Sequence, residues 1–146
     1  MYNSLLVAID GSEEGKKALD LACRLAREDD AQLHLLHVPE ALHYPTTLVW
    51  GIGAVPIHEN TEELDVAAQK LIKRAESEAR DYGVMQVQTH LVKGDPARTI
   101  LSQAELLKVD TIVIGSRGLG NLTGLMMGSV SHKITNSAKC GVIVVR

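Results

Sequence analysis

Five short apolar runs divide the chain, and amphipathic helical patterns fill the intervals between them. The runs are rich in Val, Ile and Leu and cover residues 5–9, 32–38, 84–92, 111–114 and 142–145. Apolar runs of this length predict strands buried on both faces of a parallel sheet. The third run alternates apolar and polar positions, which favours a place at the edge of the sheet.

The intervals between the runs predict four helices. Apolar residues recur there at helical spacing, as they do from Leu64 to Ala79. Residue types that cap or begin helices precede each pattern. They are Ser12, Asn60 or Thr61, Asp95 with Pro96, and Ser129. Gly83 is the expected stop of the second helix, and the fourth helix is expected to end near Ala138.

The alternation of strands and helices predicts an α/β fold. We expect an open parallel sheet with helices on both faces, in one domain over residues 1–146. Such sheets bind ligands at the carboxyl ends of their strands, where the strand order reverses. Asp10-Gly11-Ser12 follows the first strand, and a glycine-rich segment from Gly115 follows the fourth. If these strands are neighbours, both segments converge on one site.

Composition excludes several classes of protein. A net charge of −3, only 3% aromatic residues and no Phe argue against nucleic-acid binding, which favours basic faces and stacking platforms. The longest apolar window, residues 48–57, is about half the roughly 20 residues that a membrane-spanning helix needs. The N-terminus lacks the basic segment of a signal peptide, so we expect a cytoplasmic protein. Cys23 and Cys140 are expected to be buried as small apolar side chains.

The histidines show no metal-binding spacing. His34 and His37 lie three residues apart in a predicted strand and therefore point to opposite faces. The others stand singly in the sequence; they are His43, His58, His90 and His132. We expect no structural metal. The chain also lacks a GxSxG elbow, which argues against covalent catalysis by a serine.

The glycine-rich segment carries the clearest chemistry. It reads Gly115-Ser-Arg-Gly-Leu-Gly120, and Gly128-Ser129 opens the fourth helix. Glycines let backbone N–H groups approach an anion, and a helix start adds unpaired N–H donors and the positive end of its dipole. This arrangement suits a phosphate, with Arg117 as a further contact. From the glycines alone, a flexible connection without a ligand is the alternative. The segment matches neither a Walker A loop nor the dinucleotide fingerprint, which follows the first strand.

At these residues the chain resembles the nucleotide-binding branch of the universal stress protein family. The G-x2-G-x9-G-[ST] signature of that branch is matched by Gly115, Gly118, Gly128 and Ser129. The resemblance extends to residues 7–12, 94–96 and 140–145 and so spans nearly the whole chain. It implies a five-stranded, Rossmann-like adenine-nucleotide-binding sheet of strand order 3-2-1-4-5, and homodimers paired through the last strand.

The resemblance also implies an ATP site. The triphosphate is placed on Gly118, Gly128, Ser129 and Val130, and the ribose near Gly115. Asp10 would lie near the ribose and phosphates and contact Mg²⁺ indirectly, although the residues alone favour a plain helix-start carboxylate there. The adenine is placed against Ala8, Ile9 and Val38, with the Val38 backbone reading the base edge. Further predicted site residues are Ser116, Arg117, Gly120, Asn121 and Ser131.

The implied function is that of an ATP-binding regulatory or adaptor protein in stress response, acting as a homodimer or a larger assembly. One alternative is a slow Mg-dependent ATPase, in which Asp10 with a metal and Arg117 support phosphoryl transfer. No convincing general base is visible for that reaction. Another alternative is a partner that regulates a membrane transporter. Segment 39–58 contains Trp50 and is either a lid or partner-binding loop, or a loop folded over the core.

Overall fold

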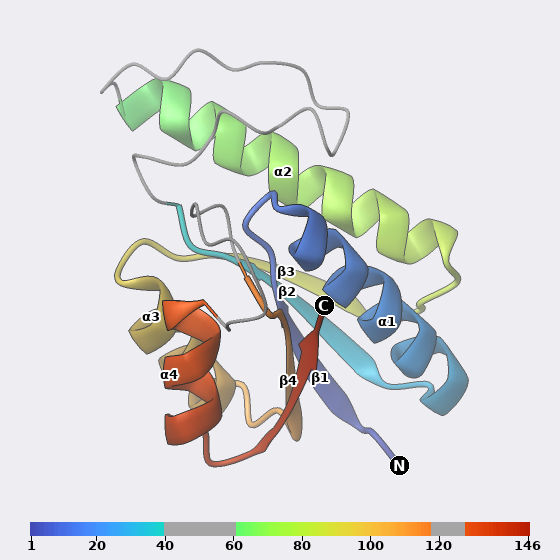
Figure 1. Ribbon diagram of the computed structural model, residues 1–146. Helices are drawn as coiled ribbons and strands as arrows, with labels where there is room; N and C mark the ends of the chain where they lie inside the picture. Colours follow the sequence, from blue (N-terminus) through green and yellow to red (C-terminus); the bar gives the residue numbers. More distant parts are fainter. Residues whose placement is uncertain (40–60, 118–127) are drawn as a thin grey trace.

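A parallel β-sheet forms the middle layer of the molecule, with helices on both of its faces (Figure 1). The computed structural model describes residues 1–39, 61–117 and 128–146. In chain order the elements are β1 (Ser4–Ala8), α1 (Glu13–Asp29), β2 (Gln32–His37), α2 (Thr61–Asp81), β3 (Val87–Leu91), α3 (Pro96–Leu106), β4 (Thr111–Gly115), α4 (Ser129–Ser137) and β5 (Gly141–Val145). The five strands pair in the order β3-β2-β1-β4-β5, which confirms the predicted α/β fold and the edge position of β3.

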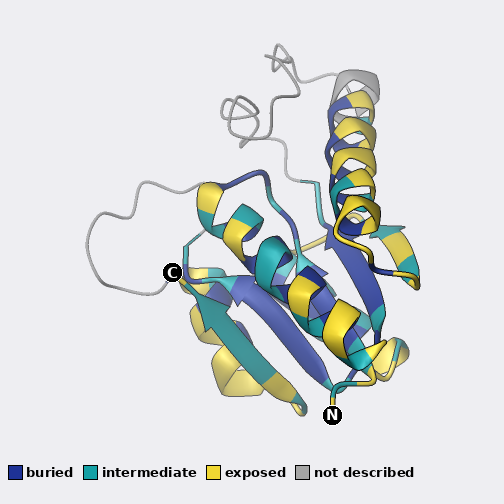
Figure 2. Cartoon of the chain, turned by 90° about the vertical axis from the view of Figure 1, so that its right-hand side faces the viewer, coloured by how far each residue is buried: buried dark blue, intermediate teal, exposed yellow. Residues whose placement is uncertain are grey.

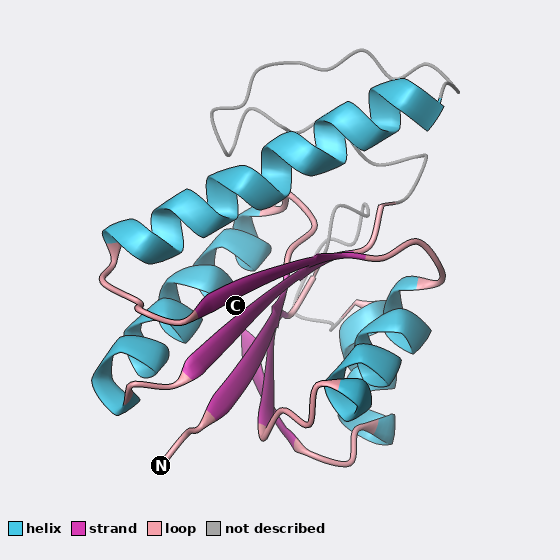
Figure 3. Cartoon of the chain, turned by 180° about the vertical axis from the view of Figure 1, so that it is seen from behind, coloured by secondary structure: helices cyan, strands magenta, loops and turns pink. Residues whose placement is uncertain are grey.

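Each face of the sheet has its own apolar core, because successive strand residues point to opposite sides. Leu5 and Val7 of β1 pack on the side of α1 and α2, whereas Leu6 packs on the side of α3 and α4. Figure 3 shows the two pairs of helices on either side of the sheet. Figure 2 shows the buried strands in dark blue, with exposed positions along the outer sides of the helices. The central strands β1 and β4 are therefore buried on both faces, as their apolar runs predict.

Helix boundaries follow the expected capping residues. The Ser12 hydroxyl accepts a hydrogen bond from the Gly15 N–H at 3.0 Å and caps α1. The Asp95 carboxylate accepts from the Arg98 N–H at 3.0 Å and caps α3, with Pro96 in its first turn. Gly83 follows α2 with a φ of 95°, a conformation that glycine adopts without strain.

Two details differ from the sequence-based expectation. The third strand begins at Val87 rather than Val84, because the Val84 N–H bonds to the Ala79 carbonyl at 3.1 Å and closes the end of α2. Cys23 is buried as expected, but Cys140 is only partly buried. Among the described residues, no helix is both long and apolar enough to cross a membrane.

Candidate functional site

The carboxyl ends of β1 and β4 lie side by side at the centre of the sheet. The two strands are parallel neighbours, with Val7 opposite Val113. Strand order reverses here, because β2 follows β1 on one side and β4 lies on the other. The pairing brings the segment after β1 next to the segment after β4, as the sequence analysis expects of neighbouring strands. Ligand sites in open α/β sheets form at this position.

Asp10 and Ser12 order the turn between β1 and α1. One carboxylate oxygen of Asp10, Oδ1, accepts hydrogen bonds from both the backbone N–H and the hydroxyl of Ser12, the former at 2.9 Å. A Cβ at Gly15 would lie 2.8 Å from that same oxygen, so the first turn of α1 needs a glycine there. Asp10 is half-buried, and its helix-start role is thus realised through Oδ1.

Gly115 brings the end of β4 against the first turn of α1. A Cβ there would lie 2.8 Å from both the carbonyl carbon and the Cβ of Glu14. The neighbouring Arg117 guanidinium lies 3.7 Å from the Glu14 carboxylate, so Arg117 is directed toward the same helix turn. These contacts give Gly115 and Arg117 a packing and positioning role at the site.

The start of α4 is fastened to the end of β4. The Gly128 N–H donates to the Ser116 carbonyl at 2.7 Å. The Ser131 hydroxyl donates to the Ser116 carbonyl at 2.8 Å and lies 3.1 Å from the Gly115 carbonyl. These bonds fix the helix N-terminus directly beside the carboxyl end of β4.

This N-terminus lacks the side-chain cap that α1 and α3 possess. Gly128 occupies the N-cap position and contributes no side-chain hydrogen bond. The first helical bond runs from the His132 N–H to the Gly128 carbonyl at 3.0 Å. The N–H groups of Ser129, Val130 and Ser131 therefore begin the helix without intrahelical acceptors. Together with the helix dipole, they form a cradle for an anion.

The residues predicted to contact adenine divide between the two faces of the sheet. The side chain of Ile9 is buried in the core under α1 and α2. Ala8 and Val38 are half-buried on the face of α3 and α4, as is Val130 at the start of α4. The structure thus brings Ala8, Val38 and Val130 onto one face and leaves the Ile9 side chain on the other. The backbone of Ile9 still joins β1 to β2, since its N–H donates to the Leu36 carbonyl at 2.8 Å.

His37 belongs to this region, although the sequence analysis gave it no role. It is only 3% exposed at the end of β2, and its Nδ1 lies 2.6 Å from the Ile9 carbonyl oxygen. Burial lowers the pKa of His37, while the bond to Ile9 and the nearby Asp10 act in the opposite direction. A neutral imidazole with its proton on Nδ1 donates to Ile9 and braces the ends of β1 and β2. Only strand pairing reveals this contact.

Several predicted features lie outside the described residues. They are Gly118, Gly120 and Asn121 of the glycine-rich segment, and residues 40–58 of the lid or partner-binding loop. Among the described residues, no group of three or more His, Cys, Asp and Glu side chains could hold a metal ion.

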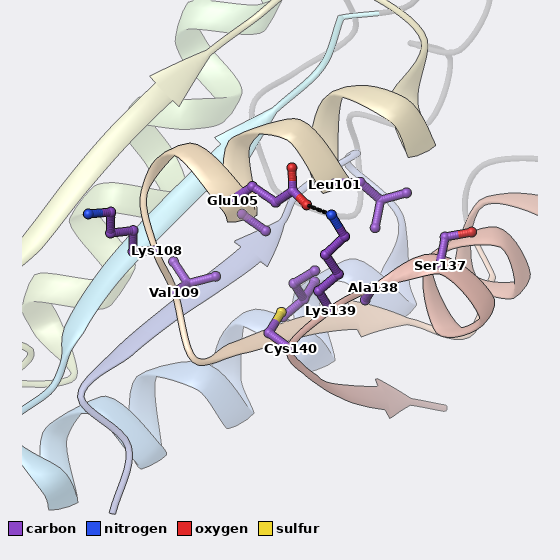
Figure 4. A pocket seen from close by; sticks show the side chains of 10 residues that line it. Leu101, Glu105, Lys108, Val109, Ser137, Ala138, Lys139 and Cys140 are labelled. Carbon is purple, nitrogen blue, oxygen red and sulfur yellow. Dashed lines mark ion pairs between the residues drawn. The ribbon is translucent and has the colours of Figure 1, made fainter.

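A separate hollow lies at the opposite, amino-terminal end of the strands, between α3 and α4 (Figure 4). Its volume is about 280 Å³, and Leu101, Val109 and Cys140 are among the residues that line it. An ion pair of 2.9 Å between Lys139 and Glu105 crosses it. Burial raises the pKa of the Cys140 thiol, which disfavours the nucleophilic thiolate. The hollow lies far along the sheet from the segments after β1 and β4 and takes no part in that site.

Comparison with known proteins supports a single family. A sequence model described as the universal stress protein family matches residues 1–146. The universal stress protein YxiE of Bacillus subtilis is 42% identical, with 100% of each chain covered. The solved structure of universal stress protein UspA from Lactobacillus plantarum has a TM-score of 0.80 at 25% identity, covering 99% of this chain and 98% of that chain. A universal stress protein from Archaeoglobus fulgidus, solved in complex with dAMP, has a TM-score of 0.72 at 23% identity and covers the same shares; this likeness shows a shared fold.

Proposed function

This chain belongs to the universal stress protein family, and from that premise we propose that it binds ATP at the carboxyl ends of β1 and β4. The observation that carries the proposal is the uncapped N-terminus of α4, fastened beside the end of β4. Its free N–H groups and the helix dipole suit the negative charge of phosphates. The dAMP complex of a protein with the same fold supports an adenine nucleotide as the ligand.

The geometry refines the proposed roles of the site residues. The phosphates rest on the N–H groups of Ser129 and Val130, together with Gly118. The ribose lies near Gly115, and Asp10 reaches Mg²⁺ through water. The adenine packs on Ala8 and Val38, which share a face, whereas Ile9 contributes backbone only. His37 supports that surface from beneath by its bond to the Ile9 carbonyl.

We further propose that the nucleotide acts as a regulatory signal rather than as a substrate for rapid hydrolysis. Hydrolysis needs a group that orients the attacking water and stabilises the transition state. Asp10 uses Oδ1 to hold Ser12, and the His37 imidazole is buried against the Ile9 carbonyl. Arg117 is directed toward Glu14. With these groups committed to structure, we expect phosphate release to be absent or slow, and unchanged in Asp10→Ala.

Mass spectrometry of the nucleotide released from purified, denatured protein tests the identity of the ligand without assuming one. We expect ATP or its breakdown products in amounts approaching one per chain. Added Mg-ATP should then raise the melting temperature of nucleotide-free protein, since a ligand at a hundredfold excess over Kd stabilises the native state by about 2.7 kcal/mol. An unmoved melting curve would contradict the proposal, and rapid phosphate release that depends on Asp10 would favour the ATPase alternative.

A further inference from the structure

Two histidines from neighbouring strands meet on the face of the sheet that carries α3 and α4. Nδ1 of His34, on β2, lies 3.0 Å from Nε2 of His90, on β3. The ring centroids are 5.2 Å apart, and the ring planes are inclined by 36°. Strand pairing creates this contact, because Gln88 lies opposite His34 and His90 follows two residues later on the same face. Along the sequence His90 stands alone, since 56 residues separate it from His34.

The pair has one closed side and one open side. His34 is 5% exposed, and Leu36, the residue opposite His90, belongs to the core of this face. His90 is half-buried on the edge strand, and the neighbouring Gln88 is exposed. An ion can therefore reach the two nitrogens from the edge of the sheet without opening the core.

Burial favours the neutral form of both imidazoles, from which metal ligands arise. Burial lowers the pKa of His34, as does the nearby His90, and burial alone lowers the pKa of His90. These shifts favour neutral rings at pH 7, and a neutral imidazole keeps one lone pair for a metal ion. One of the two facing nitrogens carries the proton of their hydrogen bond and the other offers its lone pair. Because both pKa values are low, few protons compete with the ion at neutral pH.

We propose that His34 and His90 form a two-histidine site for a divalent first-row transition ion, with Cu²⁺ bound most tightly. Metal–nitrogen bonds to histidine are about 2.0–2.1 Å long, so nitrogens 3.0 Å apart subtend about 91–97° at a shared ion. That is the angle between adjacent ligands in the tetragonal geometry that Cu²⁺ prefers. A tetrahedral Zn²⁺ site would need the nitrogens about 3.3 Å apart, which ring rotation can also reach, so the preference for Cu²⁺ rests on the order of affinities. Imidazole ligands also follow the order of affinities in which Cu²⁺ stands highest.

Binding replaces the hydrogen bond between the rings with two metal–nitrogen bonds. The ring that donates this hydrogen bond moves its proton, through solvent, to its other nitrogen and stays neutral. Each ring also turns by about 45° to direct its lone pair at the ion. Water molecules and the exposed Gln88 carboxamide complete the coordination. Because the ion joins edge strand β3 to β2, it stabilises the native state over the unfolded chain by mass action. The site lies on a different pair of strands from the proposed nucleotide site and does not depend on it.

The test is a Cu²⁺ titration of tag-free, nucleotide-free protein in which His43 and His58, outside the described residues, are replaced by Gln. This parent is compared with added His90→Gln and with the matched control His132→Gln, an exposed histidine on α4. Electron paramagnetic resonance counts the nitrogens bound to the ion. We expect one Cu²⁺ per chain, bound by two imidazole nitrogens. Loss of His90 should weaken Cu²⁺ affinity at least about tenfold. Loss of a residue that only supports a metal ligand already costs about that much. His132→Gln should change nothing.

A gain-of-affinity variant guards against a folding defect in His90→Gln. Gln88→His, on the exposed edge opposite His34, places a third imidazole beside the pair and should tighten Cu²⁺ binding and raise the melting temperature in its presence. Undiminished binding by folded His90→Gln would overturn the proposal. A parent that binds no Cu²⁺, or a Gln88→His variant that binds no more tightly than the parent, would overturn it as well.

Discussion

Gly115 and Gly128, two glycines of the same motif, lack side chains for different reasons. A Cβ on Gly115 would lie 2.8 Å from the backbone of Glu14, so the protein itself needs this glycine. A Cβ on Gly128 would come no nearer than 3.5 Å to Arg117 and Ser116, which is ordinary contact, and its φ of −67° suits any residue. Packing among the described residues therefore does not require a glycine at position 128.

This difference predicts that the same substitution destabilises the protein at Gly115 and changes its stability little at Gly128. Gly115→Ala should lower the free energy of unfolding by about 1–3 kcal/mol, as overpacking does. Gly128→Ala should change it by less than about 1 kcal/mol, because the weaker N-cap of Ala is largely offset by the smaller conformational entropy of the unfolded chain. Urea unfolding of both variants measures the difference. Equal destabilisation by the two substitutions would show that Gly128 also serves packing.

For single residues, the sequence predicts which ones gather at the site more reliably than it predicts their contacts there. Asp10, Ser12, Gly115 and Ser131 were all predicted site residues or caps, and all lie where β1, β4 and α4 meet. Strand alternation predicts that Ile9 and Ala8 point to opposite faces of the sheet. Which of the two can contact a ligand depends on how the helices cover each face. The contacts of His37 and His90 arise from strand pairing, which spacing along the chain does not encode.

Among the elements, β2 and β3 concentrate the buried histidines. Burial lowers the pKa of His34, His37 and His90. The unfolded chain binds protons at these groups more readily than the native state does, so their contribution to stability is complete above the unfolded pKa of about 6.5 and is lost as the pH falls below it. Each fully titrating group contributes a slope of up to about 1.4 kcal/mol per pH unit.

We therefore expect the free energy of unfolding to fall between pH 6.5 and pH 5, before most carboxylates titrate. Urea midpoints measured across this range test the expectation. His90→Gln removes one of the three groups and should make the loss shallower, whereas the exposed control His132→Gln should leave it unchanged. A flat profile in the wild type would show that the three histidines titrate normally.

The helices and strands themselves were predicted with few errors, because each has strong local signals. Capping by Ser12 and Asp95 and the stop at Gly83 are properties of adjacent residues. The start of β3 was misplaced because Val84 reads as a strand residue, yet its backbone closes α2. The pattern of apolar residues does not reveal whether the Val84 backbone bonds to the end of α2 or pairs with a neighbouring strand.

For the whole molecule, the outer edge of β5 is the natural surface for the proposed homodimer. The Gly141 N–H and the Val145 carbonyl bond toward β4, so Gly141, Ile143 and Val145 direct their backbone groups inward. Val142 and Val144 direct theirs outward, because alternate residues of a strand face opposite edges. These outward groups can pair with the same strand of a second copy.

Val144→Pro tests this arrangement, since proline removes an outward N–H and leaves the bonds between β4 and β5 intact. We expect the variant to be monomeric by size-exclusion chromatography with light scattering, with its fold retained by circular dichroism. Val144→Thr keeps the N–H and should remain dimeric. A folded Val144→Pro dimer would place the interface elsewhere.

The central claim is that α4 begins without a cap because its N-terminus holds the phosphates of ATP. Gly128→Asp tests that claim most directly. An aspartate at the N-cap stabilises the helix, but its side chain occupies the proposed phosphate position and its negative charge repels the phosphates. Isothermal titration calorimetry of Mg-ATP into nucleotide-free protein should show one site per chain in the wild type. Gly128→Asp should show no binding, at a melting temperature no lower than that of the wild type. Equal ATP binding by the two proteins, or none by the wild type, would contradict the account.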